Sequence, residues 1–166
     1  MYAVSMPFIL HGLKTLDALL AKAEAHCEAK KIKPEAILSF RLFPDMFPFI
    51  NQVQLVTDFS KGCAARLSGQ SVPSYADEEK TFSELHARVA KTIAFVSSVD
   101  ATSLVGAESR PVTIRVGRTE EKTFSGADYF NGFVLPNFYF HLATAYNILR
   151  HNGVELGKND YMGRTL

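Results

Sequence analysis

The side chains of this sequence best suited to chemistry are His141 and two amides that helical spacing places near it. Asn137 and His141 are four residues apart in a segment of helical periodicity, so they lie one turn apart on one face. Such a pair can hold a metal ion or a water molecule between its members. An earlier segment places Gln52 in the middle of an otherwise apolar helical face. We therefore expect Gln52, Asn137 and His141 to form a polar cluster inside an apolar bundle.

Two interpretations of this cluster stay open. An unpaired buried polar group costs about 1–3 kcal/mol, so the cluster needs a reason. In the structural interpretation, Gln52 and His141 satisfy each other and fix the register of two helices. In the functional one, they line a ligand pocket in which His141 is the catalytic general base. Thr144, His86 and Asp45 are then further ligand-binding residues around it.

A second polar group, formed by Asp58, Lys61 and Arg66, follows Gln52 in the same segment. Asp58 and Lys61 are three residues apart, which predicts a surface ion pair. Arg66 projects nearer the buried face, from which it could reach a carboxylate or an anionic ligand. Because charged side chains are mostly exposed, we expect this group to be solvated.

Four helical segments must position these residues. The apolar spacing predicts helices at about 7–30, 45–67, 82–99 and 137–150. Asp45 is the expected N-cap of the second helix, and Gly69 suits its C-cap. The sequence from Thr81 to Glu84 has the form of a capping box at the start of the third helix. Four helices of this length predict an antiparallel bundle.

The segment before the last helix has a different character. Residues 112–116 alternate and are rich in β-branched side chains, and residues 121–124 could pair with them. No repeat or flexible linker divides the chain. We therefore expect a single domain, residues 1–166, of the all-α class, with a short hairpin inserted before the fourth helix.

Composition and charge narrow the class of protein. Hydrophobic residues make up 47% of the chain, and 18 Lys and Arg against 17 Asp and Glu give a net charge of +1. This balance argues against a broad nucleic-acid surface. No apolar run approaches a membrane span, and the first residues do not have the form of a signal peptide. The two cysteines are too few for a disulfide framework, and we expect a cytoplasmic protein.

Four aromatic residues near the last helix predict an interaction surface. Phe130, Phe133, Tyr139 and Phe140 would form an exposed aromatic face. Because monomers seldom expose large apolar patches, this face favours a homodimer. Alternatively, the hairpin and the C-terminal tail cover it.

Several segments together resemble a known group of helical bundles. They are the runs FPDMFP (43–48), ARLSG (65–69), LPNFYFH (135–141), AYNILRHNGV (145–154) and GKNDYMG (157–163). These runs are similar to those of an uncharacterised, domain-of-unknown-function branch of the DinB/YfiT-like four-helix bundles. The resemblance covers nearly the whole chain.

The resemblance implies a location for a site. Superfamily members commonly bind nickel or zinc through three histidines, one in the second helix and two in an H-x-x-x-H arrangement in the fourth. By position, His141 is the second histidine of that pair, Asn137 replaces the first, and Gln52 lies near the remaining ligand. Amides bind first-row transition metals weakly, so the metal triad is expected to be degenerate, with His141 as its one histidine.

The sequence thus predicts a DinB-like bundle that binds a small molecule in a polar pocket. Two alternatives stay open. One is a divalent-metal-dependent enzyme resembling the thiol-dependent transferases of the superfamily. The other is a non-catalytic interaction module whose polar cluster only sets the register of the helices.

Overall fold

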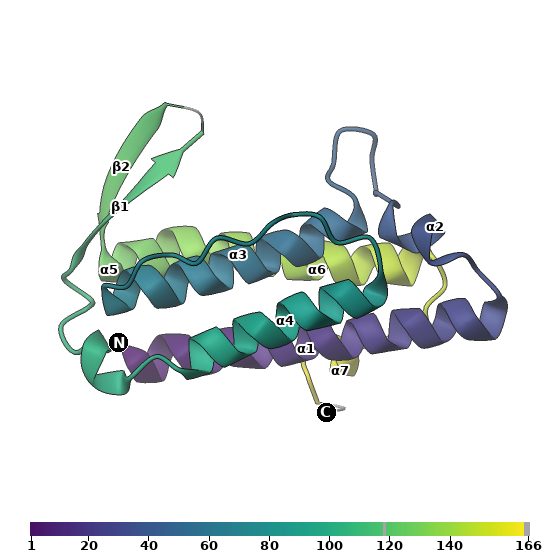
Figure 1. The fold of residues 1–166 in the computed structure, drawn as a ribbon, viewed down its shortest axis with the longest axis horizontal. Coiled ribbons are helices and arrows are strands. Elements are labelled where there is room, and N and C mark those ends of the chain that lie inside the picture. Colours follow the sequence, from purple (N-terminus) through teal and green to yellow (C-terminus); the bar gives the residue numbers. More distant parts are fainter. Residues whose placement is uncertain (118, 165–166) are drawn as a thin grey trace.

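Four long helices pack side by side in the computed structural model, which describes residues 1–117 and 119–164 (Figure 1). They are α1 (Tyr2–Lys30), α3 (Phe49–Ser68), α4 (Phe82–Ser97) and α6 (Leu135–His151). The shorter elements are α2 (Pro34–Leu38), η1 (Ala101–Leu104), β1 (Pro111–Val116), β2 (Glu120–Ser125), α5 (Gly126–Asp128), η2 (Tyr129–Val134) and α7 (Lys158–Tyr161). The mostly helical fold with a hairpin before the last long helix is confirmed, and the short helices add to the four that were predicted.

The predicted apolar stripe of α1 packs into the core. All six residues of that stripe are buried: Ile9, Leu13, Leu16, Leu20, Ala23 and Cys27. The helix begins earlier than predicted, at Tyr2, so Pro7 lies inside it. By length and composition α1 could cross a membrane, but half of its most apolar window is buried inside the fold.

The path between α3 and α4 corrects the predicted antiparallel arrangement. Helix α3 ends at Gly69, whose φ of 77° is one that glycine adopts without strain. Residues 70–80 then run back along the bundle, and α3 and α4 point in the same direction (Figure 1). An extended residue covers at most about 3.6 Å, against about 1.5 Å in a helix, so this segment can span the 20 residues of α3. The neighbouring pairs α1–α4 and α3–α6 are antiparallel.

The start of α3 also differs from the prediction. Asp45 is exposed in the loop that follows α2 and caps no helix, while Pro48 holds the N-cap position with extended backbone angles. A proline disfavours helical geometry in the residue before it, so the helix cannot extend back through Phe47. The helix therefore begins at Phe49.

The predicted capping box of α4 is present. The Thr81 hydroxyl accepts a hydrogen bond from the Glu84 backbone N–H at 3.2 Å. In return, the Glu84 carboxylate accepts one from the Thr81 backbone N–H at 2.9 Å. These two bonds satisfy backbone donors that have no partner within the helix, and they fix its first turn.

The predicted hairpin forms between β1 and β2. The two strands are antiparallel, with Val112 opposite Phe124. Val112 and Ile114 are buried, and the two strands extend from one end of the bundle (Figure 1).

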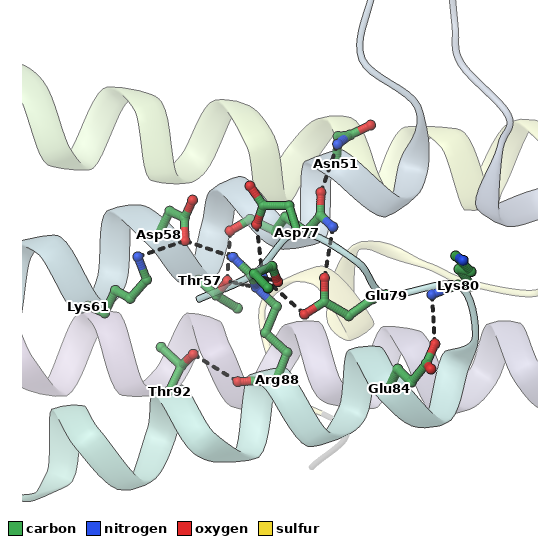
Figure 2. A network of polar contacts seen from close by, with 12 residues as sticks. Asn51, Thr57, Asp58, Lys61, Asp77, Glu79, Lys80, Glu84, Arg88 and Thr92 are labelled. Carbon is green, nitrogen blue, oxygen red and sulfur yellow. Dashed lines mark hydrogen bonds and ion pairs between the residues drawn. The ribbon is translucent and has the colours of Figure 1, made fainter. Parts of the chain in front are cut away.

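Arg88 of α4 fastens the 70–80 connector to the bundle (Figure 2). Its buried guanidinium donates to the carbonyl of Ala76 and the carboxylate of Glu79, both at 3.0 Å. It also donates to the Thr57 hydroxyl at 2.7 Å and the Asp58 carboxylate at 2.8 Å, both on α3. One side chain of α4 thus binds α3 and the connector together.

The same network corrects the expectation of a solvated Asp58–Lys61 pair. The pair forms at 2.9 Å, as its spacing predicts, but Lys61 is only 8% exposed. Asp58 also accepts from Arg88, and the Tyr75 ring of the connector lies 4.9 Å from the Lys61 ammonium and 5.3 Å from the Arg88 guanidinium carbon. The connector, which spacing within α3 cannot reveal, covers these charges.

We expect Arg88→Met to lower the free energy of unfolding by about 3 kcal/mol, because it leaves partly buried carboxylates without their cation. Lys91→Met is the matched control. It removes the same charge from the exposed face of α4, where Lys91 only lies over the Tyr75 ring, and should cost less than about 1 kcal/mol. Urea denaturation measures both values, and equal losses would contradict the role of Arg88.

The carboxylate of Glu79 makes the strength of this network depend on pH. Partial burial alone would raise its pKa, but hydrogen bonds from Gln54 and Arg88 hold that pKa below the ordinary 4.5. Its stabilising contribution is therefore fully present above about pH 4.5 and is lost as the pH falls through the lower folded-state pKa. We expect the advantage of the wild type over Glu79→Gln in free energy of unfolding to be smaller at pH 3 than at pH 7. Urea titrations at both pH values test this, and a difference independent of pH would contradict it.

Candidate functional site

Gln52 and His141 meet where α3 packs against α6. The Oε1 atom of Gln52 lies 2.7 Å from Nδ1 of His141. Both side chains are buried, Gln52 almost completely. The contact that helical spacing predicted between these residues is therefore present.

The chain around Gln52 fixes the proton on the imidazole. The Nε2 amide group of Gln52 donates to the Phe47 carbonyl at 2.8 Å. Because a carbonyl can only accept, the amide must turn its oxygen toward His141. Nδ1 of His141 therefore carries the hydrogen, and Nε2 of the neutral ring holds a lone pair.

Aromatic packing keeps this ring neutral and oriented. Burial lowers the pKa of His141 below its ordinary value of 6.5. The Phe59 ring stacks on the imidazole at a centroid distance of 5.7 Å, and Phe140 meets it edge-on at 5.2 Å. In the described part of the chain, no hydrogen-bond donor pairs with Nε2 of His141. The site thus presents a neutral imidazole whose one available nitrogen is an acceptor.

Asn137 and Thr144 do not join this cluster. The Asn137 amide donates to the carbonyl of Phe133 at 2.7 Å, and the Thr144 hydroxyl donates to that of Phe140 at 2.7 Å. Each acceptor lies four residues earlier, in the preceding helical turn. Side chains of this kind readily bond to nearby backbone, and here that local contact replaces the predicted one.

His86 and Asp45, also expected near the pocket, lie elsewhere. Nδ1 of His86 lies 2.5 Å from the Asp17 carboxylate, and its Nε2 lies 3.9 Å from that of Glu24. Both carboxylates belong to α1, so His86 connects α4 to α1 rather than to His141. Asp45 stays exposed in the loop before α3.

The donor set does not fit the nickel or zinc ion that the resemblance implies. Residues 1–117 and 119–164 contain no cluster of three His, Cys, Asp or Glu that could hold a metal ion. The Gln52 oxygen is occupied by the Nδ1 proton of His141, and the Asn137 amide is bound to backbone. Burial raises the pKa of the Cys63 thiol to about 12, so no thiolate is available there.

A cleft of about 330 Å³ lies between α3, β1 and η2, next to this site. Phe59, which also stacks on the His141 ring, forms part of its wall. Arg66, half-buried as its spacing predicted, donates to the Tyr129 hydroxyl at 3.1 Å instead of to a carboxylate. The role of Tyr129 has no signal in local spacing, because η2 and α3 are far apart in the sequence.

Arg88 is a further polar residue that the sequence prediction missed. It lies between the buried residues Leu85 and Val89, and Thr92, one turn later, is also buried. Helical periodicity alone would therefore have placed Arg88 on the inward face. The general rule that arginine is exposed concealed this signal.

The predicted aromatic face is smaller than expected. Phe130 is buried and Phe133 is half-buried against Phe59 and Tyr129, so neither forms an exposed face. Tyr139 and Phe140 remain exposed. The homodimer stays a prediction that rests on these two rings.

Comparisons with known proteins identify a family and a solved structure with a similar fold. A family model described as a domain of unknown function (DUF1993) matches residues 1–162. The crystal structure of a DinB family member protein from Shewanella denitrificans is similar to this chain, with 37% sequence identity and a TM-score of 0.89. The match covers 97% of this chain and 90% of that one. No curated protein matches the sequence.

The contact between Gln52 and His141 can be tested by titration. We expect the imidazole of the wild type to titrate below pH 6.5, because burial disfavours its charged form. Gln52→Glu should raise the midpoint above that of the wild type, since a carboxylate beside the Nδ1 hydrogen stabilises the imidazolium ion. Gln70→Glu, the same change at an exposed position, should leave it unchanged. Histidine NMR signals report the midpoints, and an unshifted midpoint in Gln52→Glu would contradict the geometry.

Proposed function

The chain belongs to the DUF1993 family of domains of unknown function, and we propose that it binds a small molecule through Nε2 of His141. The ligand class is a neutral molecule with an N–H, O–H or S–H donor. The resemblance to DinB-like proteins adds small thiols to the candidates. We also propose that the four long helices form a DinB-like four-helix bundle, which the TM-score of 0.89 supports.

One observation carries the proposal: the Phe47 carbonyl fixes the Gln52 amide, and that amide fixes the proton of His141 on Nδ1. A neutral imidazole in a single tautomer is ready to accept a hydrogen at Nε2. If His141 only fixed the register of α3 and α6, it would need the hydrogen bond from Nδ1 to Gln52 but no available Nε2 atom. With a bound donor, the same nitrogen can act as a general base.

A divalent-metal enzyme is the weaker candidate, because His141 is the one imidazole of the donor set and the amides are occupied. These side chains therefore give no basis for a metal-dependent step. A cytoplasmic location and a homodimer also remain proposals, and the exposed rings of Tyr139 and Phe140 support the second.

The matched variants His141→Asn and His141→Gln test the proposal. The asparagine amide nitrogen can take the place of Nδ1 and keep the bond to Gln52, but it leaves nothing at Nε2. We expect His141→Asn to lower the free energy of unfolding by less than about 1 kcal/mol, whereas His141→Gln, which removes the Nδ1 donor, should cost about 1–3 kcal/mol.

Diethyl pyrocarbonate, which acylates unprotonated imidazole, tests whether Nε2 is available. We expect peptide mass spectrometry to find His141 modified in the wild type at pH 7. A screen of neutral amides, phenols and small thiols by ligand-observed NMR should then give binders that His141→Asn loses. An unreactive His141, or binders that His141→Asn retains, would contradict the proposal.

A further inference from the structure

We propose that the cleft between α3, β1 and η2 binds a small organic anion with an apolar body, and that Arg66 receives its anionic group. This inference goes beyond the proposed role of His141 and does not rest on it. The cleft measures about 330 Å³, which suits a ligand of one aromatic ring with a short side chain.

The charges of the cleft favour an anion. Lys61, Arg66 and Arg115 line it together with one carboxylate, that of Asp58. Asp58 is already bound to Lys61 and to Arg88, as Figure 2 shows. Among the described residues, neither Arg66 nor Arg115 forms an ion pair with a carboxylate. Arg66 therefore lines the cleft without a carboxylate partner, and the exposed Arg115 adds a second positive residue to its lining.

The position of Arg66 is built into α3. Its guanidinium lies over Gly62, where a Cβ atom would stand 2.5 Å from Nη1 of Arg66. A glycine inside a helix carries a cost relative to alanine, and here it creates the space that the folded-back arginine occupies. Arg66 is thereby directed to the Tyr129 hydroxyl, to which it donates at 3.1 Å.

Tyr129 adds a neutral donor beside this cation. Burial raises the pKa of Tyr129 to about 12, although the neighbouring Arg66 acts in the opposite direction, so the phenol keeps its proton. The phenol oxygen accepts from Arg66, and its own O–H finds no acceptor among the described residues. A guanidinium with donors to spare and an O–H beside it match the two oxygens of a carboxylate, or those of a phosphate.

The other walls of the cleft are apolar and suit the body of such a ligand. Phe59 and Phe133 contribute aromatic rings that meet edge to face at 5.7 Å, and Ile114 and Val72 add aliphatic surface. Phe133 also stacks on Tyr129 at 5.9 Å, within the π-helical turn η2. An apolar wall next to an uncompensated cation distinguishes an organic anion from a free inorganic one.

Isothermal titration calorimetry with 3-phenylpropionate tests the proposal on the full chain. We expect binding by the wild type that is at least tenfold tighter than that of the neutral ester methyl 3-phenylpropionate, which has no N–H, O–H or S–H donor for His141. Arg66→Met should weaken binding at least tenfold. Arg41→Met removes the same charge from the exposed loop before α3, and it should change binding less than twofold.

Gly62→Ala provides a variant that keeps every charge of the cleft and raises the helix propensity of α3. Its Cβ displaces the guanidinium of Arg66, so binding should fall while the urea midpoint of unfolding stays the same or rises. His141→Asn should bind as the wild type does, so this test and that of His141 can fail separately.

Phenyl phosphate in the same titrations identifies the preferred anionic group. Tighter binding of either anion supports the proposal if Arg66→Met abolishes the preference over the neutral analogue. The proposal is overturned if the wild type binds neither anion at millimolar concentration. It is equally overturned if the ester binds as well as the acid, or if Arg41→Met and Arg66→Met weaken binding equally.

Discussion

The arrangement of this protein depends on a buried arginine that holds a long connector against two parallel helices. Residues 70–80 contain no helix or strand, so their backbone does not support itself. Arg88 donates to the connector at Ala76 and Glu79 and to α3 at Asp58, and its charge is offset by the carboxylates around it (Figure 2). A buried cation without such partners would be strongly unfavourable, so connector and helices must come together for any of them to be stable.

That arrangement places α3 between α4 and α6, and α3 supplies one partner to three polar contacts between elements. Gln52 meets His141 of α6, Thr57 meets Arg88 of α4, and Arg66 meets the phenol of η2. Each pair satisfies groups that would be costly to bury alone. Along α3, Thr57 belongs to the structural contact with Arg88, whereas Gln52 and Arg66 belong to the two proposed ligand sites.

Those two sites differ in their electrostatics although they share an aromatic wall. At His141, burial suppresses charge, and a fixed tautomer leaves a neutral acceptor. In the cleft, the guanidinium of Arg66 lies beside the Tyr129 ring and has no carboxylate partner among the described residues. Phe59 stacks on the imidazole of His141 and also lines the cleft, so it belongs to both sites. A neutral donor and an organic anion are therefore the ligands that the two environments separately favour.

The sequence by itself determined the features that depend on neighbouring residues. Apolar periodicity located the long helices, Gly69 and the Thr81 capping box marked two of their ends, and β-branched alternation located the hairpin. The proximity of Gln52 and His141 also followed, because each interrupts an apolar face that had to enter one core.

Other features were decided by the tertiary structure alone. They depend on the path of residues 70–80 and on which hydrogen-bond partner each polar side chain meets. It turned α4 parallel to α3, buried Arg88 and Lys61 beneath residues 70–80, and directed His86 to α1. It also left Asn137 bonded to the preceding turn, at Phe133 of η2, rather than to His141. The physical reason is that hydrogen-bond partners are chosen by distance in space, and spacing along one helix does not specify which other element arrives beside it.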